Sequence, residues 1–202
     1  MIGGSMTGKL LAIGVSGAVL LGCSDRGGSA GDSSLGLEAE SGKTRMTAGG
    51  MPVGQLSDAN IFYVLDAANR VDSAAGAIAV TKGTNAEVRE YGAMMARDHH
   101  RLRQDGQTLA TRLAISPAAP PGDTAQAHYD KTMATLNGAA KGRDFDKAYI
   151  DHEVAYHKTV LETAVSVMAA AQNAELKNLI QKAAPVIQGH LDRAQAIQAN
   201  LQ

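Results

Sequence analysis

The stretch YIDHEVAYHKTV, residues 149–160, carries a glutamate and two histidines through an apolar pattern of helical period. At 100° per residue, Glu153 and His157 fall near the middle of the apolar stripe, and His152 falls at its edge. The apolar members of this stripe are Tyr149, Ile150, Val160, Leu161, Ala164, Val167, Met168 and Ala171. The pattern predicts a long helix whose buried face carries titratable groups.

Three other long segments of helical period have the same feature. In the first, Asp72 lies among apolar residues, and in the last, His190 lies at the centre of the stripe. On a third, His99 lies on one flank of the stripe and Asp98 on the other. Because a buried charge is costly unless it is paired or ligated, these four helices together predict one shared polar cluster in the interior.

Caps and helix breakers set the predicted helix boundaries. The expected helices start at Ser57 or Asp58 and end near KGTN, span 85–114, start again at Asp123 or Thr124 and end near GAAKGRD, and span 144–171 and 174–201. The prolines of ISPAAPPGD (115–123) end the second helix, and Pro185 is expected to kink the last one or to mark where it restarts.

Four long helices and one shorter helix, in a chain with no convincing strand, predict an all-α fold. The shorter third helix, of about 20 residues, would be roughly 30 Å long and could carry the chain from one end of a bundle to the other. We therefore expect a ferritin-like four-helix bundle with a shorter crossover helix, with a plain up-and-down bundle as the alternative.

The N-terminal region indicates a targeting signal and an anchor. One lysine precedes an apolar run at residues 10–21, which is followed by Gly22 and Cys23. This run is short for a membrane span and fits a secretory signal. The ending is similar to the bacterial lipobox, which predicts a signal peptide over 1–22 and lipidation of Cys23; an ordinary signal peptide with a free cysteine is the alternative.

The predicted mature chain has two parts. Residues 23–56 are rich in Gly and Ser and predict a flexible tether, and residues 57–202 form the helical domain. By resemblance to other bacterial lipoproteins, Ser24 favours sorting to the outer membrane. We therefore expect a cell-envelope protein, attached to the membrane through Cys23, with its body in the periplasm.

Composition narrows the possible functions. The formal net charge is -1, so the chain lacks the excess of basic residues that binding of nucleic acid normally needs. If the only cysteine is lipidated, no thiol remains for catalysis. We find no serine nucleophile motif and no Gly-rich phosphate loop, so a binding or structural protein is favoured over an enzyme.

Four segments resemble a bacterial family catalogued as domain of unknown function 4142, which groups secreted or outer-membrane proteins expected to have a ferritin-like fold. They are FYVLDAANRVDSAAGAIAV, NAEVREYGAMMARDHHRL, FDKAYIDHEVAYHKTV and AELKNLIQKAAPVIQGHLDRA. The resemblance implies characteristic polar positions at Asp98, His99, His157 and His190. The family usually has Glu where this chain has Asp72, and often Gln where it has Glu153.

The polar cluster has two interpretations. His99, His157 and His190, with Asp72 or Glu153, could bind Cu, Zn or Fe, and Met95 one turn before His99 would favour copper. Alternatively, the carboxylates orient the imidazoles in a hydrogen-bonded network that fixes helix register without a ligand. A ferritin-type di-iron centre is not expected, because the Glu-x-x-His pairs that it needs are missing.

The functional expectation has the same two branches. The first is a lipid-anchored envelope protein with a binding, structural or envelope-stress role. The second is a periplasmic transition-metal-binding protein that uses the inward histidines and carboxylates of its bundle.

Overall fold

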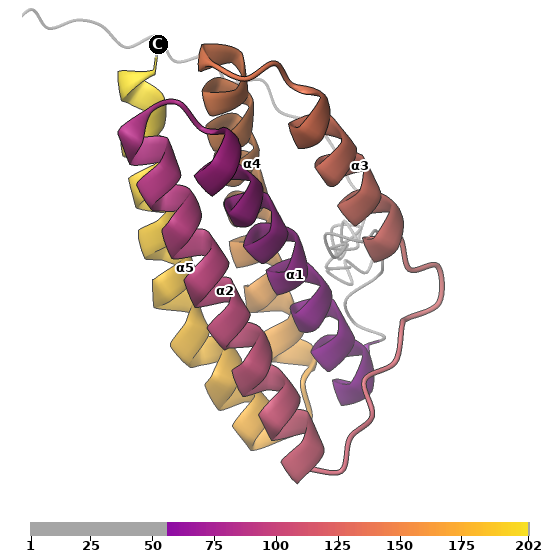
Figure 1. Ribbon diagram of the computed structural model, residues 1–202. Helices are drawn as coiled ribbons and strands as arrows, with labels where there is room; N and C mark the ends of the chain where they lie inside the picture. The colour runs from indigo at the N-terminus through magenta and orange to yellow at the C-terminus, as the bar shows by residue number, and fades with distance from the viewer. Residues whose placement is uncertain (1–55, 202) are drawn as a thin grey trace, which may run out of the picture. The chain divides into compact units, whose positions relative to one another are not determined.

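The computed structural model describes residues 56–201 and confirms an all-α fold. Its helices are α1 (Asp58–Lys82), α2 (Ala86–Arg112), α3 (Ala125–Gly138), α4 (Arg143–Ala170) and α5 (Ala174–Asn200) (Figure 1). Within residues 56–201 there is no strand, and no helix is long and apolar enough to span a membrane. The predicted signal peptide, Cys23 and nearly all of the predicted tether lie outside the described residues.

Asparagine and serine caps start three of the four long helices. Ser57 forms a capping box with Asn60 at the start of α1. Asn85 and Asn173 accept hydrogen bonds from the backbone two and three residues later, at the starts of α2 and α5. These side chains pair N–H groups that have no partner inside the helix, so the boundaries are set by local chemistry.

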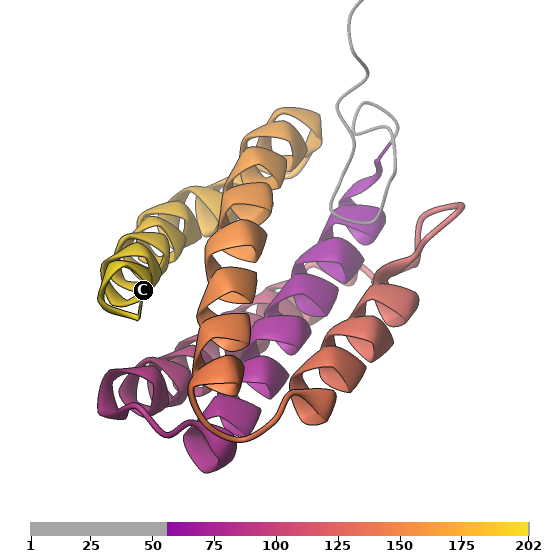
Figure 2. The ribbon, with the colours of Figure 1, turned by 90° about the horizontal axis from the view of Figure 1, so that it is seen from above.

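The bundle is made of two antiparallel hairpins joined by α3 (Figures 1 and 2). Helices α1 and α2 form one hairpin, and α4 and α5 form the other. The first pairs with the second through α2 against α5 and α1 against α4. Helix α3 returns the chain from the end of α2 to the start of α4 and packs outside the four, mainly on α1. This is the predicted ferritin-like connectivity.

The crossover helix is shorter than predicted. Helix α3 has 14 residues, or about 21 Å, rather than about 20 residues. Residues 113–124 span the remaining distance without a helix, since extended chain rises by more than 3 Å per residue. This segment is pinned to the start of α1: the Ala118 amide donates to the Ala59 carbonyl, and Asn60 Nδ2 donates to the Ala118 carbonyl.

Carboxylates tie each hairpin to the turn of the other. Asp146, in the first turn of α4, accepts hydrogen bonds from the Thr84 amide, the Thr84 hydroxyl and the Asn85 amide. Asp58, in the first turn of α1, accepts from the backbone amides at 172 and 173. Since Asp58 and Asp146 act at opposite ends of the bundle, the two hairpins are held in a fixed register.

Helices α1 and α2 approach most closely at Gly76 and Gly92. A Cβ atom placed on Gly76 would lie 2.5 Å from the Gly92 carbonyl oxygen, and one on Gly92 would lie 2.7 Å from the Ala79 Cβ. Both distances are too short for a side chain, so glycine is required for this contact.

Two separate apolar clusters form the core, one towards each end of the bundle. Tyr91, Met95, Phe145, Tyr149 and Ile197 belong to the first, which surrounds the α1–α2 turn and the start of α4. The second cluster includes Leu56, Ile61, Phe62, Leu109, Val167, Leu176 and Ile180. Leu56, the last residue of the predicted tether, is thus part of the folded body.

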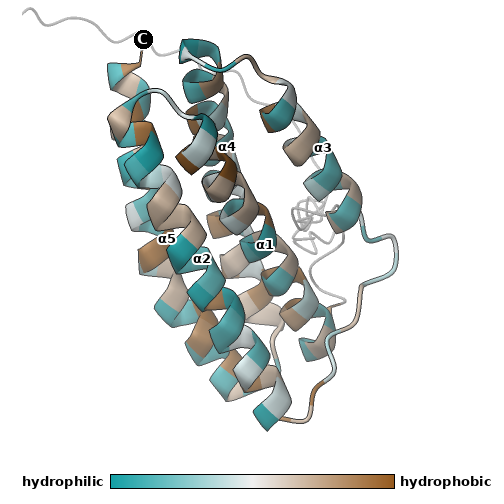
Figure 3. Ribbon diagram, in the orientation of Figure 1, coloured by the Kyte–Doolittle hydropathy of each residue, from teal (hydrophilic) through white to brown (hydrophobic). Residues whose placement is uncertain are grey.

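Hydrophobic residues recur among hydrophilic ones along each helix (Figure 3), as expected for helices that bury one face. Helix α5 is continuous through Pro185, so it does not restart there. Val186 lies on the apolar stripe of the helical pattern, but it is 40% exposed. Both residues lie on the outer face, where the lost backbone hydrogen bond of a proline is least costly.

We predict that Gly76→Ala destabilises the fold by about 1–3 kcal/mol, because its Cβ would force the two backbones apart. The matched control is Gly106→Ala on α2, where a Cβ meets nothing within 4 Å. This change should stabilise the protein by about 0.5–1 kcal/mol, since alanine favours the helix. Urea unfolding measures both. Equal effects of the two substitutions would contradict the close helix contact.

Candidate metal centre

A layer of polar side chains lies between the two apolar clusters. Asp72 comes from α1, His99 from α2, Glu153 and His157 from α4, and His190 from α5. Each is at most 4% exposed. The structure therefore brings together all five residues predicted from the sequence. His99 was predicted on the flank of its stripe, but it is fully buried.

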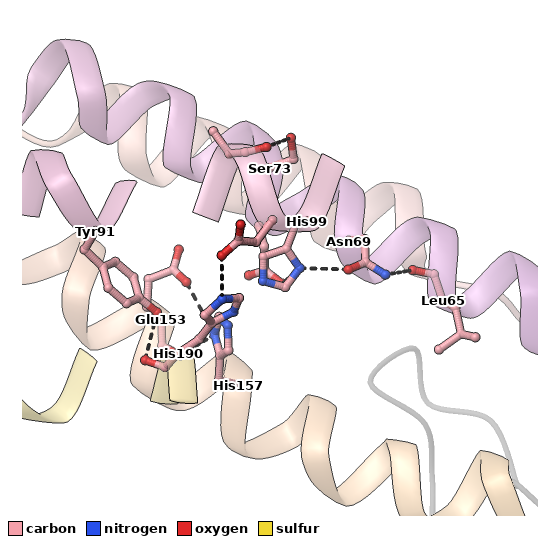
Figure 4. Close-up of polar contacts among 11 residues, drawn as sticks. Leu65, Asn69, Ser73, Tyr91, His99, Glu153, His157 and His190 are labelled. Atoms are coloured by element: carbon pink, nitrogen blue, oxygen red, sulfur yellow. Dashed lines mark hydrogen bonds and ion pairs between the residues drawn. The ribbon is translucent and has the colours of Figure 1, made fainter. Parts of the chain in front are cut away.

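The three imidazoles are immediate neighbours (Figure 4). Ring centroids are 5.4 Å apart for His99 and His157, 5.1 Å for His99 and His190, and 5.6 Å for His157 and His190. One ligand nitrogen from each ring lies within 4.8 Å of one from each of the others. Slight inward movement of these side chains would bring all three nitrogens to one ion.

Asn69 fixes the tautomer of His99. The Asn69 amide nitrogen donates to the Leu65 carbonyl at 2.7 Å, so its amide oxygen faces His99. That oxygen lies 2.8 Å from His99 Nδ1 and can only accept a hydrogen bond. His99 Nδ1 therefore carries the hydrogen, and Nε2 holds the free lone pair.

Acceptors also fix the other two imidazoles. His157 Nδ1 lies 3.0 Å from the backbone carbonyl oxygen of Glu153. His190 Nε2 lies 3.2 Å from Asp98 Oδ2. Partial burial would raise the pKa of Asp98, but hydrogen bonds from Arg97 and His190 outweigh it and lower that pKa, so the carboxylate accepts. The free lone pairs are then on His157 Nε2 and His190 Nδ1.

These three free nitrogens have no hydrogen-bond partner within residues 56–201. Buried polar atoms in folded proteins are nearly always paired, so an interior with three such atoms calls for a partner. A water molecule has two hydrogens and can donate to two of the three lone pairs. A metal ion can accept all three at once.

Two carboxyl groups accompany the imidazoles. Asp72 Oδ2 lies 3.4 Å from His99 Nδ1, and Glu153 Oε2 lies 3.4 Å from His157 Nδ1. Asp72, Glu153 and His157 also form a second group whose ligand atoms lie within 4.8 Å of one another. Burial raises the pKa of both carboxyl groups well above the usual range, and for Glu153 the nearby Asp72 adds to the effect.

Burial has the opposite effect on the imidazoles. It lowers the pKa of His99 well below its usual range, with help from the two neighbouring histidines, and lowers the pKa of His157 to about 3. Burial also lowers the pKa of His190, although Asp98 opposes this. The rings are therefore neutral at pH 7, the form in which imidazole ligates a metal.

The remaining histidines lie away from this cluster. His100 is exposed. His128 of α3 and His152 of α4 both stack on the ring of Tyr156, at centroid distances of 5.2 and 5.4 Å. His152 is thus an edge residue, as predicted. Met95 is fully buried in the first apolar cluster.

Sequence reasoning missed Asn69 as the partner of His99. Its signal was its place one turn before Asp72, on the same side of α1. A second missed signal is the repeat of NAEV at 85–88 as NAEL at 173–176. Each segment begins with the asparagine that caps its helix, Asn85 for α2 and Asn173 for α5. His99 and His190 then follow on these two helices.

The fold and the site define an all-α bundle with a buried cluster of histidines and carboxyl groups. The chain belongs to the family described as "Domain of unknown function (DUF4142)", whose model matches residues 43–197. No curated protein and no solved structure matches it.

The pKa of His152 makes stability depend on pH. Burial, with a smaller contribution from His128, lowers the pKa of His152 from 6.5 to about 4. Above pH 6.5 the ring is neutral in both states and its contribution is fully present. Between pH 6.5 and about 4 only the unfolded state binds the proton, so stability falls as the pH falls, by up to about 3 kcal/mol.

Urea unfolding between pH 7 and 4 tests this. In His152→Gln the decrease should be shallower by as much as one proton, whereas His100→Gln, at an exposed position, should follow the parent. Parallel curves for the parent and His152→Gln would contradict the burial of this ring.

Proposed function

We propose that this protein binds a late first-row transition metal ion, such as Zn²⁺ or Cu²⁺, through His99 Nε2, His157 Nε2 and His190 Nδ1. The observation that carries the proposal is that three adjacent buried imidazoles each hold one ring nitrogen without a hydrogen-bond partner, while an acceptor binds the N–H of the other nitrogen. Neutral imidazole is a preferred ligand of Zn, Cu, Fe and Ni.

The surroundings of the cluster support a metal centre. In metal sites, each ligating histidine usually donates its other N–H to a carboxylate or carbonyl group, which fixes the tautomer. The amide oxygen of Asn69, the backbone carbonyl of Glu153 and the carboxylate of Asp98 supply these acceptors. Asp72 and Glu153 lie close enough to offer a further ligand, because a bound cation favours loss of the carboxyl proton that burial otherwise retains.

The alternative, a network that only fixes helix register, fits less well. In such a network the polar atoms satisfy one another. Here Asp72 Oδ1 and both Glu153 carboxyl oxygens, besides the three ring nitrogens, lack a hydrogen-bond partner of good geometry within residues 56–201. A buried network left this open would cost stability unless a ligand completes it.

We further propose that the metal is bound in the bacterial cell envelope. The predicted signal peptide and lipidation of Cys23 would attach the bundle to the outer membrane, with its body in the periplasm. A site without a recognised nucleophile suits binding and handling of the ion more than turnover of a substrate.

Elemental analysis of the 202-residue chain, purified without added metal or a histidine tag, tests the proposal. We expect a single Zn or Cu ion per chain, either as purified or after titration. His157→Gln and His190→Gln, each with an unchanged helical spectrum, should lose the ion. His100→Gln, at an exposed position next to His99, should retain it. A parent that takes up no metal, or variants that bind as the parent does, would overturn the proposal.

The acceptors behind the ligands should also matter. We predict that Asp98→Asn weakens metal affinity by about 10- to 100-fold, because the amide no longer holds His190 with a charged acceptor. Asp105→Asn, on an exposed face of α2, is the matched control and should leave the affinity unchanged. Competition with a chromophoric chelator measures both affinities. An affinity unaffected by Asp98→Asn would argue against His190 as a ligand.

A further inference from the structure

A cavity of about 290 Å³ lies between the polar layer and the second apolar cluster. It is enclosed by the first half of α1, the second half of α2, the second half of α4 and the first half of α5. Its walls reach from exposed residues, such as Gln107 and Pro117, to the fully buried Asp72 and His99. The cavity therefore connects the surface with the metal centre.

The two ends of the cavity differ in chemistry. Most of the wall is apolar, with Phe62, Leu65, Leu102, Val160, Leu179 and Ile187 among the lining residues. At the surface end, Arg103 makes a two-point ion pair with Asp66, at 3.0 and 3.1 Å, and Gln107 also donates to Asp66. The carboxylate of Asp66 is therefore already paired with Arg103 and Gln107 and is not available to a ligand at the mouth of the cavity.

The inner end is different, because its polar atoms are open. Asp72 Oδ1 and His99 Nε2 lack a hydrogen-bond partner within residues 56–201, and both side chains are 1% exposed. Since Asn69 fixes the hydrogen of His99 on Nδ1, His99 Nε2 is an acceptor. The end of an otherwise apolar cavity thus presents two unpaired polar atoms, and a hydroxyl group can donate its one hydrogen to either of them.

The volume limits the size of a ligand. An apolar cavity of about 150 Å³ holds benzene. This cavity is nearly twice as large and suits a molecule of about ten to twelve non-hydrogen atoms. Its apolar wall disfavours a charged body, because an unpaired charge would be costly there.

We propose that the cavity binds a small, uncharged, mostly apolar organic molecule whose single hydroxyl group lies at Asp72 and His99. The apolar body would fill the space between α1, α2, α4 and α5. The site shares His99 with the proposed metal centre, but it does not need the ion. When the metal is bound, His99 Nε2 ligates it, and the hydroxyl group would then donate its hydrogen to Asp72 Oδ1 instead.

The probe is para-butylphenol, which has the predicted size and one hydroxyl group. Its matched control is butylbenzene, which lacks only the hydroxyl. Titration of the chain prepared without a lipid on Cys23, in detergent-free buffer and followed by NMR, should show one saturable site for para-butylphenol. Butylbenzene should bind about tenfold more weakly, since it leaves the acceptors unpaired.

The double variant Ala164→Leu/Ala183→Leu fills the cavity from α4 and α5. This variant should weaken binding of para-butylphenol by at least about tenfold, because the added leucine side chains occupy the space of the ligand. It should still bind metal, because the three histidines are unchanged. Ala169→Leu/Ala196→Leu makes the same changes at exposed positions of the same helices and should bind as the parent does. Nuclear Overhauser contacts from para-butylphenol to the methyl groups of Leu65 and Val160 locate the ligand without a variant.

Three results would overturn the proposal: no saturable binding of para-butylphenol, equal affinity for butylbenzene, or contacts outside the cavity. Failure of the metal proposal is seen separately. Titrations are run on metal-loaded protein and on His157→Gln, whose side chain does not line the cavity. If the parent binds no metal but para-butylphenol binds both proteins, the cavity proposal holds and the metal proposal falls.

Discussion

Three buried imidazoles each donate one ring N–H to a group that can only accept, and this constraint governs the centre of the bundle. The acceptors are the Asn69 amide oxygen, the Glu153 backbone carbonyl and the Asp98 carboxylate. Because they fix the tautomers, a lone pair on each ring is left free among its neighbours. The same hydrogen bonds therefore hold the rings in place and leave free the three nitrogens that the proposed metal site uses.

The rest of the fold keeps this polar layer in register. Apolar clusters lie on both sides of it, and the carboxylates of Asp58 and Asp146 tie each hairpin to the turn of the other. Contact of α1 with α2 at Gly76 brings Asp72 next to His99. Burial of unpaired polar atoms lowers stability, so this layer costs the fold free energy unless its atoms find partners.

Much of this could be predicted from the sequence, because helix periodicity places Glu153, His157 and His190 on inward faces. The same periodicity placed His99 only on the flank of its apolar stripe, yet His99 is fully buried. Helix α2 packs on both α1 and α5, so its buried arc is wider than one stripe. The role of Asn69 and the length of α3 depend on contacts between helices, which the local sequence pattern does not predict.

Anomalous X-ray diffraction from crystals of the metal-loaded chain, recorded on both sides of the absorption edge of the metal, tests the central claim most directly. We predict a single peak bonded to His99 Nε2, His157 Nε2 and His190 Nδ1, at about 2.0–2.1 Å if the metal is zinc. A peak elsewhere, or these three nitrogens hydrogen-bonded to ordered water in crystals with full metal occupancy, would contradict the account.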